Sequence, residues 1–113
     1  MDASMLEFLL RLAKALAAQF GPSCEIVIHD LKSNDPDSSI VAIENGHVSG
    51  RKLGDGPSHV VLEALNSGGA VEDRLSYLAK TADGKTLKST TVYLRDENQQ
   101  PIGIFSINYD ITL

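Results

Sequence analysis

The chain of 113 residues lacks several features that mark specialised classes of protein. Its one cysteine, Cys24, excludes an internal disulfide framework and suits a reducing compartment. No apolar run is long enough to cross a bilayer, and no charged-then-apolar leader ends in a small-residue cleavage site. We therefore expect a cytoplasmic protein that has no membrane partner.

Basic side chains are also scarce. Ten Lys and Arg stand against fifteen Asp and Glu, which gives a formal net charge of -5. Direct binding to DNA or RNA phosphates needs an excess of positive charge, so the composition opposes it for this segment. The length and a hydrophobic fraction of 42% indicate a single domain over residues 1–113.

The first twenty residues predict an amphipathic helix. Ser4 and Glu7 have the spacing of a capping box, and Gly21-Pro22 is a typical helix end. The polar stripe of this helix is narrow, so we expect it to pack on two surfaces, its own sheet and a second copy of the chain. The predicted homodimer interface consists of Leu6, Leu9, Ala13, Leu16 and Phe20.

The rest of the chain reads as short strands with one helical connection. Turn residues fall at 32–38, 82–85 and 96–100, and a helix is expected from the Gly56-Pro57-Ser58 start to about Asn66. The predicted strands cover residues 25–29, 39–44, 74–81, 86–95 and 101–110. This order favours the α+β class, an antiparallel sheet covered by helices.

The run Asn45-Gly46-His47-Val48-Ser49-Gly50-Arg51-Lys52-Leu53-Gly54 contains three glycines, two basic residues, a histidine and a hydroxyl. Glycines let backbone N–H groups approach a ligand closely, and an arginine can hold a carboxylate through two parallel hydrogen bonds. We interpret this run as a loop that recognises a small anion. Arg51 is the expected clamp, assisted by Ser49 and the amides around Gly50. A glycine-rich surface turn is the alternative.

Two histidines and an acid stand where the first two predicted strands end: His29 and Asp30, then Asn45 and His47. We expect these four residues to line the strand ends of the ligand site. A metal site is conceivable, but the chain has neither His-x₃-His nor Cys-x₂-Cys spacing, so no metal is expected. The alternative for His29 is a structural hydrogen bond to backbone.

No pattern for covalent catalysis or a nucleotide cofactor is present. Ser49 is not in a Gly-x-Ser-x-Gly elbow, and Gly50 to Gly54 is not a phosphate-binding loop. Cys24 and His29 are five residues apart on a predicted strand, so their side chains are expected on opposite faces. We therefore expect neither an enzyme nor a bound cofactor.

Hydroxyl and amide groups interrupt the last two predicted strands. Ser89, Ser106 and Asn108 lie at alternate positions that otherwise carry apolar side chains, as the lining of a small-ligand pocket would. The alternative is that such groups pair with one another across strands, and we favour it for Thr90.

These blocks together carry a resemblance to a known family. The chain resembles the YheO-like transcriptional regulators in Cys24-Glu25-Ile26-Val27-Ile28-His29-Asp30, in Ser39-Ile40-Val41-Ala42-Ile43, in Asn45 to Arg51, and in the closing segments Lys88 to Asp96, Pro101-Ile102-Gly103 and Ile107 to Asp110. The resemblance covers nearly the whole chain. It departs from the pattern at Leu53-Gly54-Asp55-Gly56-Pro57, where there is an extra glycine.

The resemblance implies a PAS-like sensor domain, with a five-stranded antiparallel sheet, helices on one face and an N-terminal helix. It also implies that DNA binding belongs to a C-terminal helix-turn-helix domain that this segment does not include. We expect a ligand-sensing and dimerising domain of a bacterial regulator, whose effector is a small carboxylate-bearing molecule, either amino-acid-like or an organic acid. The alternative is an interaction module that binds no ligand.

Overall fold

The computed structural model describes residues 1–32, 39–51, 62–63, 66–68 and 70–113. Its elements in chain order are α1 (Ala3–Phe20), β1 (Cys24–Asp30), β2 (Ile40–Glu44), the 3₁₀ turn η2 (Gly46–Val48), β3 (Arg74–Lys80), β4 (Thr86–Arg95) and β5 (Pro101–Asp110). All five predicted strands and the first helix are confirmed. The predicted helix at 56–66, most of the turn at 32–38 and the loop beyond Arg51 lie largely outside the described residues.

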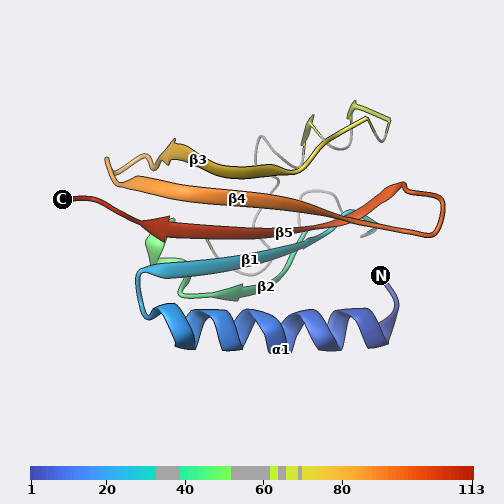
Figure 1. Cartoon of the computed structure of the whole chain (residues 1–113), viewed down its shortest axis with the longest axis horizontal. Coiled ribbons are helices and arrows are strands. Elements are labelled where there is room, and N and C mark those ends of the chain that lie inside the picture. The colour runs from blue at the N-terminus through green and yellow to red at the C-terminus, as the bar shows by residue number, and fades with distance from the viewer. Residues whose placement is uncertain (33–38, 52–61, 64–65, 69) are drawn as a thin grey trace.

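The five strands form one antiparallel sheet in the order β2-β1-β5-β4-β3 (Figure 1). Its centre is β5, a strand from the end of the chain, which pairs with β1 on one side and β4 on the other. Helix α1 runs along the β1–β2 side of the sheet (Figure 1). The N-terminal helix and five antiparallel strands confirm the expected α+β fold.

The N-cap of α1 differs from the prediction. Asp2 is the cap: its backbone is extended, and its Oδ1 accepts a hydrogen bond from the amide of Met5 at 2.8 Å. Ser4 is already inside the first turn, so the predicted capping box does not form. The end of the helix is as predicted, because Gly21 has φ +86°, a conformation that glycine adopts easily.

One face of the sheet packs against α1 and is called the helix face. Its core combines Leu9 and Ala13 of the helix with four sheet residues, Cys24, Ile26, Ile28 and Phe105. Helix α1 contacts mainly β1 and β2, so it covers the β1–β2 part of the helix face more fully than the β4–β3 part. The stability of this face therefore comes from apolar burial.

The opposite face is called the polar face. Alternation along β1 places Glu25, Val27 and His29 on it, and the register aligns Glu25 with Asn108 and then Ser89 across β5 and β4. Among the residues that the structure describes, the buried polar side chains are those of Glu25, His29, Ser39, Ser89 and Thr91. The same strands thus carry an apolar core on the helix face, whereas the polar face combines buried hydrogen-bonding groups with a smaller apolar cluster of Val71, Tyr93 and Ile104.

The predicted dimer residues divide between core and surface. Leu9 and Ala13 are buried against the chain's own sheet, and Leu6 and Leu16 are half-buried, because the helix turns this stripe toward β1 and β2. Leu9 and Ala13 are therefore not on a surface that a second copy could contact. Phe20 is 54% exposed, and Phe8, which the prediction omitted, is 59% exposed.

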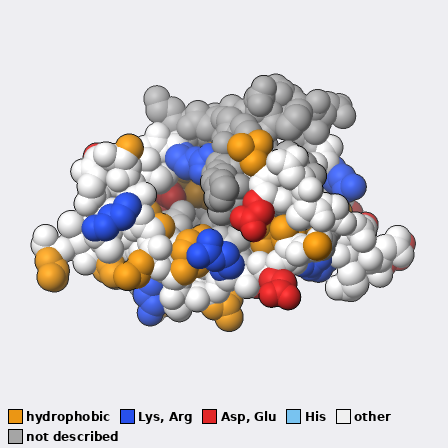
Figure 2. Space-filling model, turned by 90° about the horizontal axis from the view of Figure 1, so that it is seen from above, with side chains coloured by type: hydrophobic (Ala, Val, Ile, Leu, Met, Phe, Trp, Pro, Cys, Tyr) orange, Lys and Arg blue, Asp and Glu red, His pale blue; other side chains and the backbone are white. Residues whose placement is uncertain are grey.

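The β3 side of the sheet also exposes apolar side chains. Leu75 and Leu78 are among the most exposed large hydrophobic residues of the chain. The view over this side shows hydrophobic side chains among Lys and Arg side chains (Figure 2). Within the described part of the chain, no helix is long and apolar enough to cross a membrane.

Candidate functional site

Glu25 is the centre of a hydrogen-bond network on the polar face. Its side chain is fully buried, and both carboxyl oxygens accept hydrogen bonds. The amide and the hydroxyl of Ser49 donate to Oε2 at 3.0 and 2.5 Å, and Asn108 Nδ2 donates to Oε1 at 2.8 Å. These three donors satisfy a carboxylate that would otherwise be costly to bury.

The network continues from Glu25 across the sheet. The Ser89 hydroxyl donates to Asn108 Oδ1 at 2.7 Å. Hydrogen bonds between the side chains of Glu25, Asn108 and Ser89 therefore link β1, β5 and β4 in that order. Ser89 and Asn108, both predicted as pocket residues, are therefore brought together and also pair with each other across strands. Ser106 lies next in the ladder on the same face, opposite Val27 and Thr91.

The segment 45–51, called the site loop, attaches to this face through the Ser49 contacts. Asn45 begins it with φ 55°, and its side-chain amide donates to the carbonyl oxygens of Gly21 (3.1 Å) and Cys24 (2.8 Å). Asn45 thus fixes the start of the loop against the α1–β1 connection. The Cβ of any other residue at Gly46 would lie 2.7 Å from the Arg51 carbonyl oxygen, so the turn closes tightly on itself.

His29 is buried farther along β1 on the same face. Burial, and second the positive charge of Arg51, lower the pKa of His29 to about 4. The imidazole is therefore neutral at pH 7. Its Nδ1 shares a hydrogen bond of 2.9 Å with the Ser39 hydroxyl, so its partner is a side chain and not the backbone group considered from the sequence.

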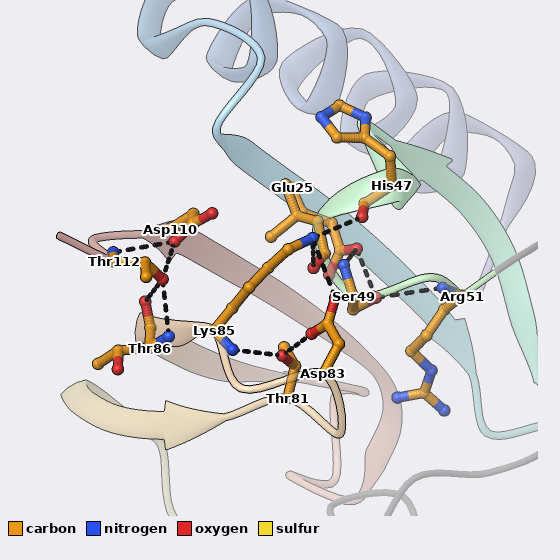
Figure 3. Close-up of polar contacts among 11 residues, drawn as sticks. Glu25, His47, Ser49, Arg51, Thr81, Asp83, Lys85, Thr86, Asp110 and Thr112 are labelled. Atoms are coloured by element: carbon orange, nitrogen blue, oxygen red, sulfur yellow. Dashed lines mark hydrogen bonds and ion pairs between the residues drawn. The ribbon is translucent and has the colours of Figure 1, made fainter.

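The other predicted site residues have different surroundings. Arg51 is half-buried, follows Gly50 (φ +79°) and donates its amide to Ser49 Oγ at 3.3 Å. His47 is exposed and its ring points away from Ser49 (Figure 3). The Asp30 side chain points to the face of the sheet opposite His29, and its carboxylate accepts a hydrogen bond from the amide of Lys32 in a local turn. Asp30 therefore lies apart from the polar network.

Sequence reasoning missed several members of the polar face. Tyr77 and Thr91 share a hydrogen bond of 2.8 Å, and the Arg74 guanidinium stacks on the Tyr77 ring at 4.1 Å from its centroid. The sequence pattern assigns Glu25 only to a strand. A signal for it existed, because a carboxylate between two apolar residues of a buried strand requires hydrogen-bond donors from elsewhere.

Cys24 and His29 lie on opposite faces of β1, as their spacing predicts. Burial, with a smaller contribution from the charge of Glu25, raises the pKa of the Cys24 thiol. Among the residues that the structure describes, no three His, Cys, Asp or Glu side chains are grouped so that they could hold a metal ion. The chemistry that the polar face offers is hydrogen bonding by hydroxyl, amide and neutral imidazole groups.

Residues 1–113 match the family model of the YheO-like PAS domain. The chain belongs to this family. It is 33% identical over 98 residues to the protein YheO of Escherichia coli strain K12, a match that covers 85% of this chain and 40% of that protein. It is also 33% identical over 103 residues to the transcriptional regulator DauR of Pseudomonas aeruginosa strain PAO1, which covers 90% of this chain and 45% of DauR.

Solved PAS and light-oxygen-voltage domains have the same fold. The PAS domain of the fruit-fly ELK potassium channel superposes with a TM-score of 0.52 at 16% identity, covering 88% of this chain and 97% of that one. A light-oxygen-voltage domain studied with a flavin analogue superposes with a TM-score of 0.53 at 24% identity, and the match covers 90% of this chain and 85% of that one. These likenesses establish the fold alone. The chain spans less than half the length of the curated relatives it matches.

Proposed function

We propose that this YheO-like PAS domain is the ligand-sensing part of a DNA-binding transcriptional regulator. The observation that carries the proposal is the buried network of Glu25, Asn108 and Ser89 on the face opposite α1, with the site loop attached to it. A structural core needs no such network, because apolar residues fill the helix face of the same strands without one. The relationship to the regulator DauR supports a regulatory role.

The proposed effector is a small molecule that carries a carboxylate, either an amino-acid-like compound or an organic acid. Arg51 is the proposed anchor, because a guanidinium binds a carboxylate through paired hydrogen bonds that are stronger than those between neutral groups. The contribution of its positive charge to the lowered pKa of His29 supports this choice. Neutral Ser89, Asn108 and His29 then orient the remainder of the molecule.

Binding acts as a population shift. An effector that contacts both the sheet and the site loop favours the arrangement in which the two are joined. DNA binding belongs to another part of the whole protein, a C-terminal helix-turn-helix domain, and the effector changes its activity through this coupling.

A thermal-shift panel tests the proposal. The probes are the twenty L-amino acids, acetate, lactate, succinate and citrate, each added in millimolar excess to the purified chain. At least one probe is expected to raise the melting temperature, because a ligand at 100 times its Kd stabilises the folded state by about 2.7 kcal/mol. Arg51→Ala is expected to abolish this increase and to leave the melting temperature without ligand nearly unchanged.

Arg11→Ala is the matched control, since Arg11 is an exposed arginine on α1 and should leave the response intact. A response that persists in Arg51→Ala would remove Arg51 from the site. No response to any probe, confirmed by calorimetry, would contradict a carboxylate effector.

A second candidate function is dimerisation or protein interaction without a ligand. It is favoured by the exposed Phe8 and Phe20 and by an open hollow of about 470 Å³ on the helix face beside Phe20. That hollow is lined by Phe20, Lys88, Thr90, Ile107, Tyr109 and Ile111. Sedimentation equilibrium of the wild type and of the Phe8→Glu/Phe20→Glu variant tests it. A dimer that dissociates in the variant supports this function, and a wild-type monomer at high micromolar concentration opposes it.

A further inference from the structure

The site loop is held from a second side by the β3–β4 hairpin. Lys85 Nζ donates hydrogen bonds to the backbone carbonyls of His47 (3.1 Å) and Val48 (3.0 Å), thirty-eight and thirty-seven residues away in sequence. Both carbonyls belong to η2, immediately before Ser49 (Figure 3). A cation that donates to the last carbonyls of a helical turn stabilises its end.

The hairpin is organised to present this lysine. Gly84 turns the chain with φ +90° and donates its amide to the Thr81 carbonyl, while the Lys85 amide donates to the Thr81 hydroxyl at 3.0 Å. Asp83 Oδ2 lies 3.6 Å from Lys85 Nζ, and Asp83 is itself held by the Thr81 hydroxyl. The ammonium group therefore donates two hydrogen bonds to carbonyl oxygens and forms an ion pair with one carboxylate.

Lys85 and Glu25 hold adjacent residues of the site loop from opposite sides. Lys85 binds the carbonyls of residues 47 and 48, and Glu25 binds the amide and hydroxyl of residue 49. Displacement of either contact would move the other, because the Val48 carbonyl and the Ser49 amide belong to the same planar peptide unit. Residues 49 to 51 include the amides and the guanidinium of the proposed anion clamp.

The same hairpin is joined to the end of β5. Thr86 donates its amide to Thr112 Oγ1 at 2.9 Å and accepts the amide of Ile111 at 2.9 Å. Asp110 Oδ1 in turn accepts the amide and hydroxyl of Thr112 (Figure 3). The site loop is thus hydrogen-bonded to Lys85, and the next residue of the chain, Thr86, is hydrogen-bonded to residues 111 and 112.

We propose that Lys85 is the positioning residue of the site loop and couples it to the end of β5. Its regulatory consequence rests on the proposed function, since loop movement on effector binding would change the hairpin contacts. The positioning role itself does not depend on any effector. Lys85 acts through the backbone of η2 and makes no contact with the proposed ligand.

Amide hydrogen exchange, followed residue by residue by NMR on the full 113-residue chain without ligand, tests the proposal. Lys85→Met keeps the length of the side chain but removes its charge and donors. We expect the amides of Ser49 and Gly50 to exchange at least tenfold faster, while those in the middle of β1 and β5 stay unchanged. Lys85→Arg, which can donate to the same carbonyls, is expected to restore slow exchange.

Lys88→Met is the matched control, because Lys88 is only three residues away, on β4, but is exposed and belongs to the helix face. A double-mutant cycle with Ser49→Ala, read at the Gly50 amide, tests coupling to Glu25. Once Ser49→Ala has released the loop, Lys85→Met should add less than twofold.

Unchanged exchange at residues 49 and 50 in Lys85→Met would overturn the positioning role, whatever the thermal-shift panel shows. Uniformly faster exchange throughout the sheet would also overturn it, because that pattern indicates global destabilisation. A panel without any stabilising probe contradicts the proposed function but leaves the exchange result standing. The two proposals therefore fail separately.

Discussion

The helix face and the polar face are built from the same strands, but the polar face adds a buried hydrogen-bond network to its apolar cluster. Ile26 and Glu25 are adjacent on β1 and both are fully buried. Ile26 is packed among apolar side chains under α1, whereas Glu25 is held by three hydrogen-bond donors from Ser49 and Asn108. Apolar packing requires only a suitable volume, but a buried carboxylate requires donors in specific positions.

The difference teaches where the chain can vary and where it is constrained. A hydrophobic neighbour of similar size can replace another on the helix face at small cost. On the polar face, the buried carboxylate depends on partners from distant segments. Glu25 is hydrogen-bonded to Ser49, which is 24 residues later in the sequence, and to Asn108, which is 83 residues later.

The largest expected effect is on the helix face. Ile26→Ala removes a fully buried side chain from the core under α1, and we expect a loss of about 2–5 kcal/mol in the free energy of unfolding. Urea denaturation measures it. Leu78→Ala, on the same face but 73% exposed, is the control and should change stability by less than about 0.5 kcal/mol. Similar losses for both would contradict the assignment of the core.

Acid should affect the polar face through His29. The pKa of His29 is lowered from its ordinary 6.5 to about 4, so the unfolded chain takes up this proton at a higher pH than the folded chain. Its contribution to stability is constant above about pH 7 and falls as the pH drops from 6.5 to 4, by up to about 3 kcal/mol.

Urea denaturation of the wild type and of His29→Gln at several pH values checks this effect. The difference in stability between the two proteins should shift in favour of the variant as the pH falls. His47→Gln, which removes an exposed histidine, is the control and should keep the pH dependence of the wild type. Parallel curves for the wild type and His29→Gln would show that His29 is not buried in its neutral form.

A smaller effect is expected from the centre of the network. Glu25→Gln keeps the size of the side chain but replaces one acceptor oxygen with an NH₂ group, which faces the donors of Ser49 or Asn108. We expect a loss of about 1–3 kcal/mol in the free energy of unfolding, because one buried donor is left without an acceptor. Glu97→Gln, in an exposed turn, is the control for loss of a carboxylate.

Differential scanning calorimetry of Glu25→Gln, Glu97→Gln and the wild type compares their stabilities. If Glu25→Gln is as stable as the wild type, the carboxylate does not hold Ser49 and Asn108, and the contrast between the two faces would disappear. The Arg51→Ala and Lys85→Met variants sharpen the contrast further, since neither is expected to disturb the helix face.

Local patterns were sufficient for the elements of this fold. Alternation in β4 and β5 placed Ser89 and Asn108 on a common face correctly, because strand geometry has a period of two residues. The end of α1 followed from Gly21-Pro22. The N-cap was assigned to Ser4 and not Asp2, because both residues suit that position and the choice depends on which backbone is extended.

The composition of the site was less accessible. Asp30 was grouped with His29 although adjacent residues of a strand point to opposite faces. Leu9 and Ala13 were assigned to a dimer interface because a hydrophobic stripe does not show whether the chain's own sheet covers it. Lys85 and Glu25 were missed since their partners, His47, Val48 and Ser49, come from a loop far away in sequence.

The sequence alone determined the first helix, the five strands, the turns at 82–85 and 96–100 and the family resemblance, because these depend on side-chain periodicity and on backbone preferences of neighbouring residues. Only the tertiary structure decided which residues share the site. The strand order β2-β1-β5-β4-β3 brings β5, from the end of the chain, between β1 and β4. That arrangement aligns Glu25 with Asn108 and Ser89, and no local pattern encodes a pairing between residues 83 positions apart.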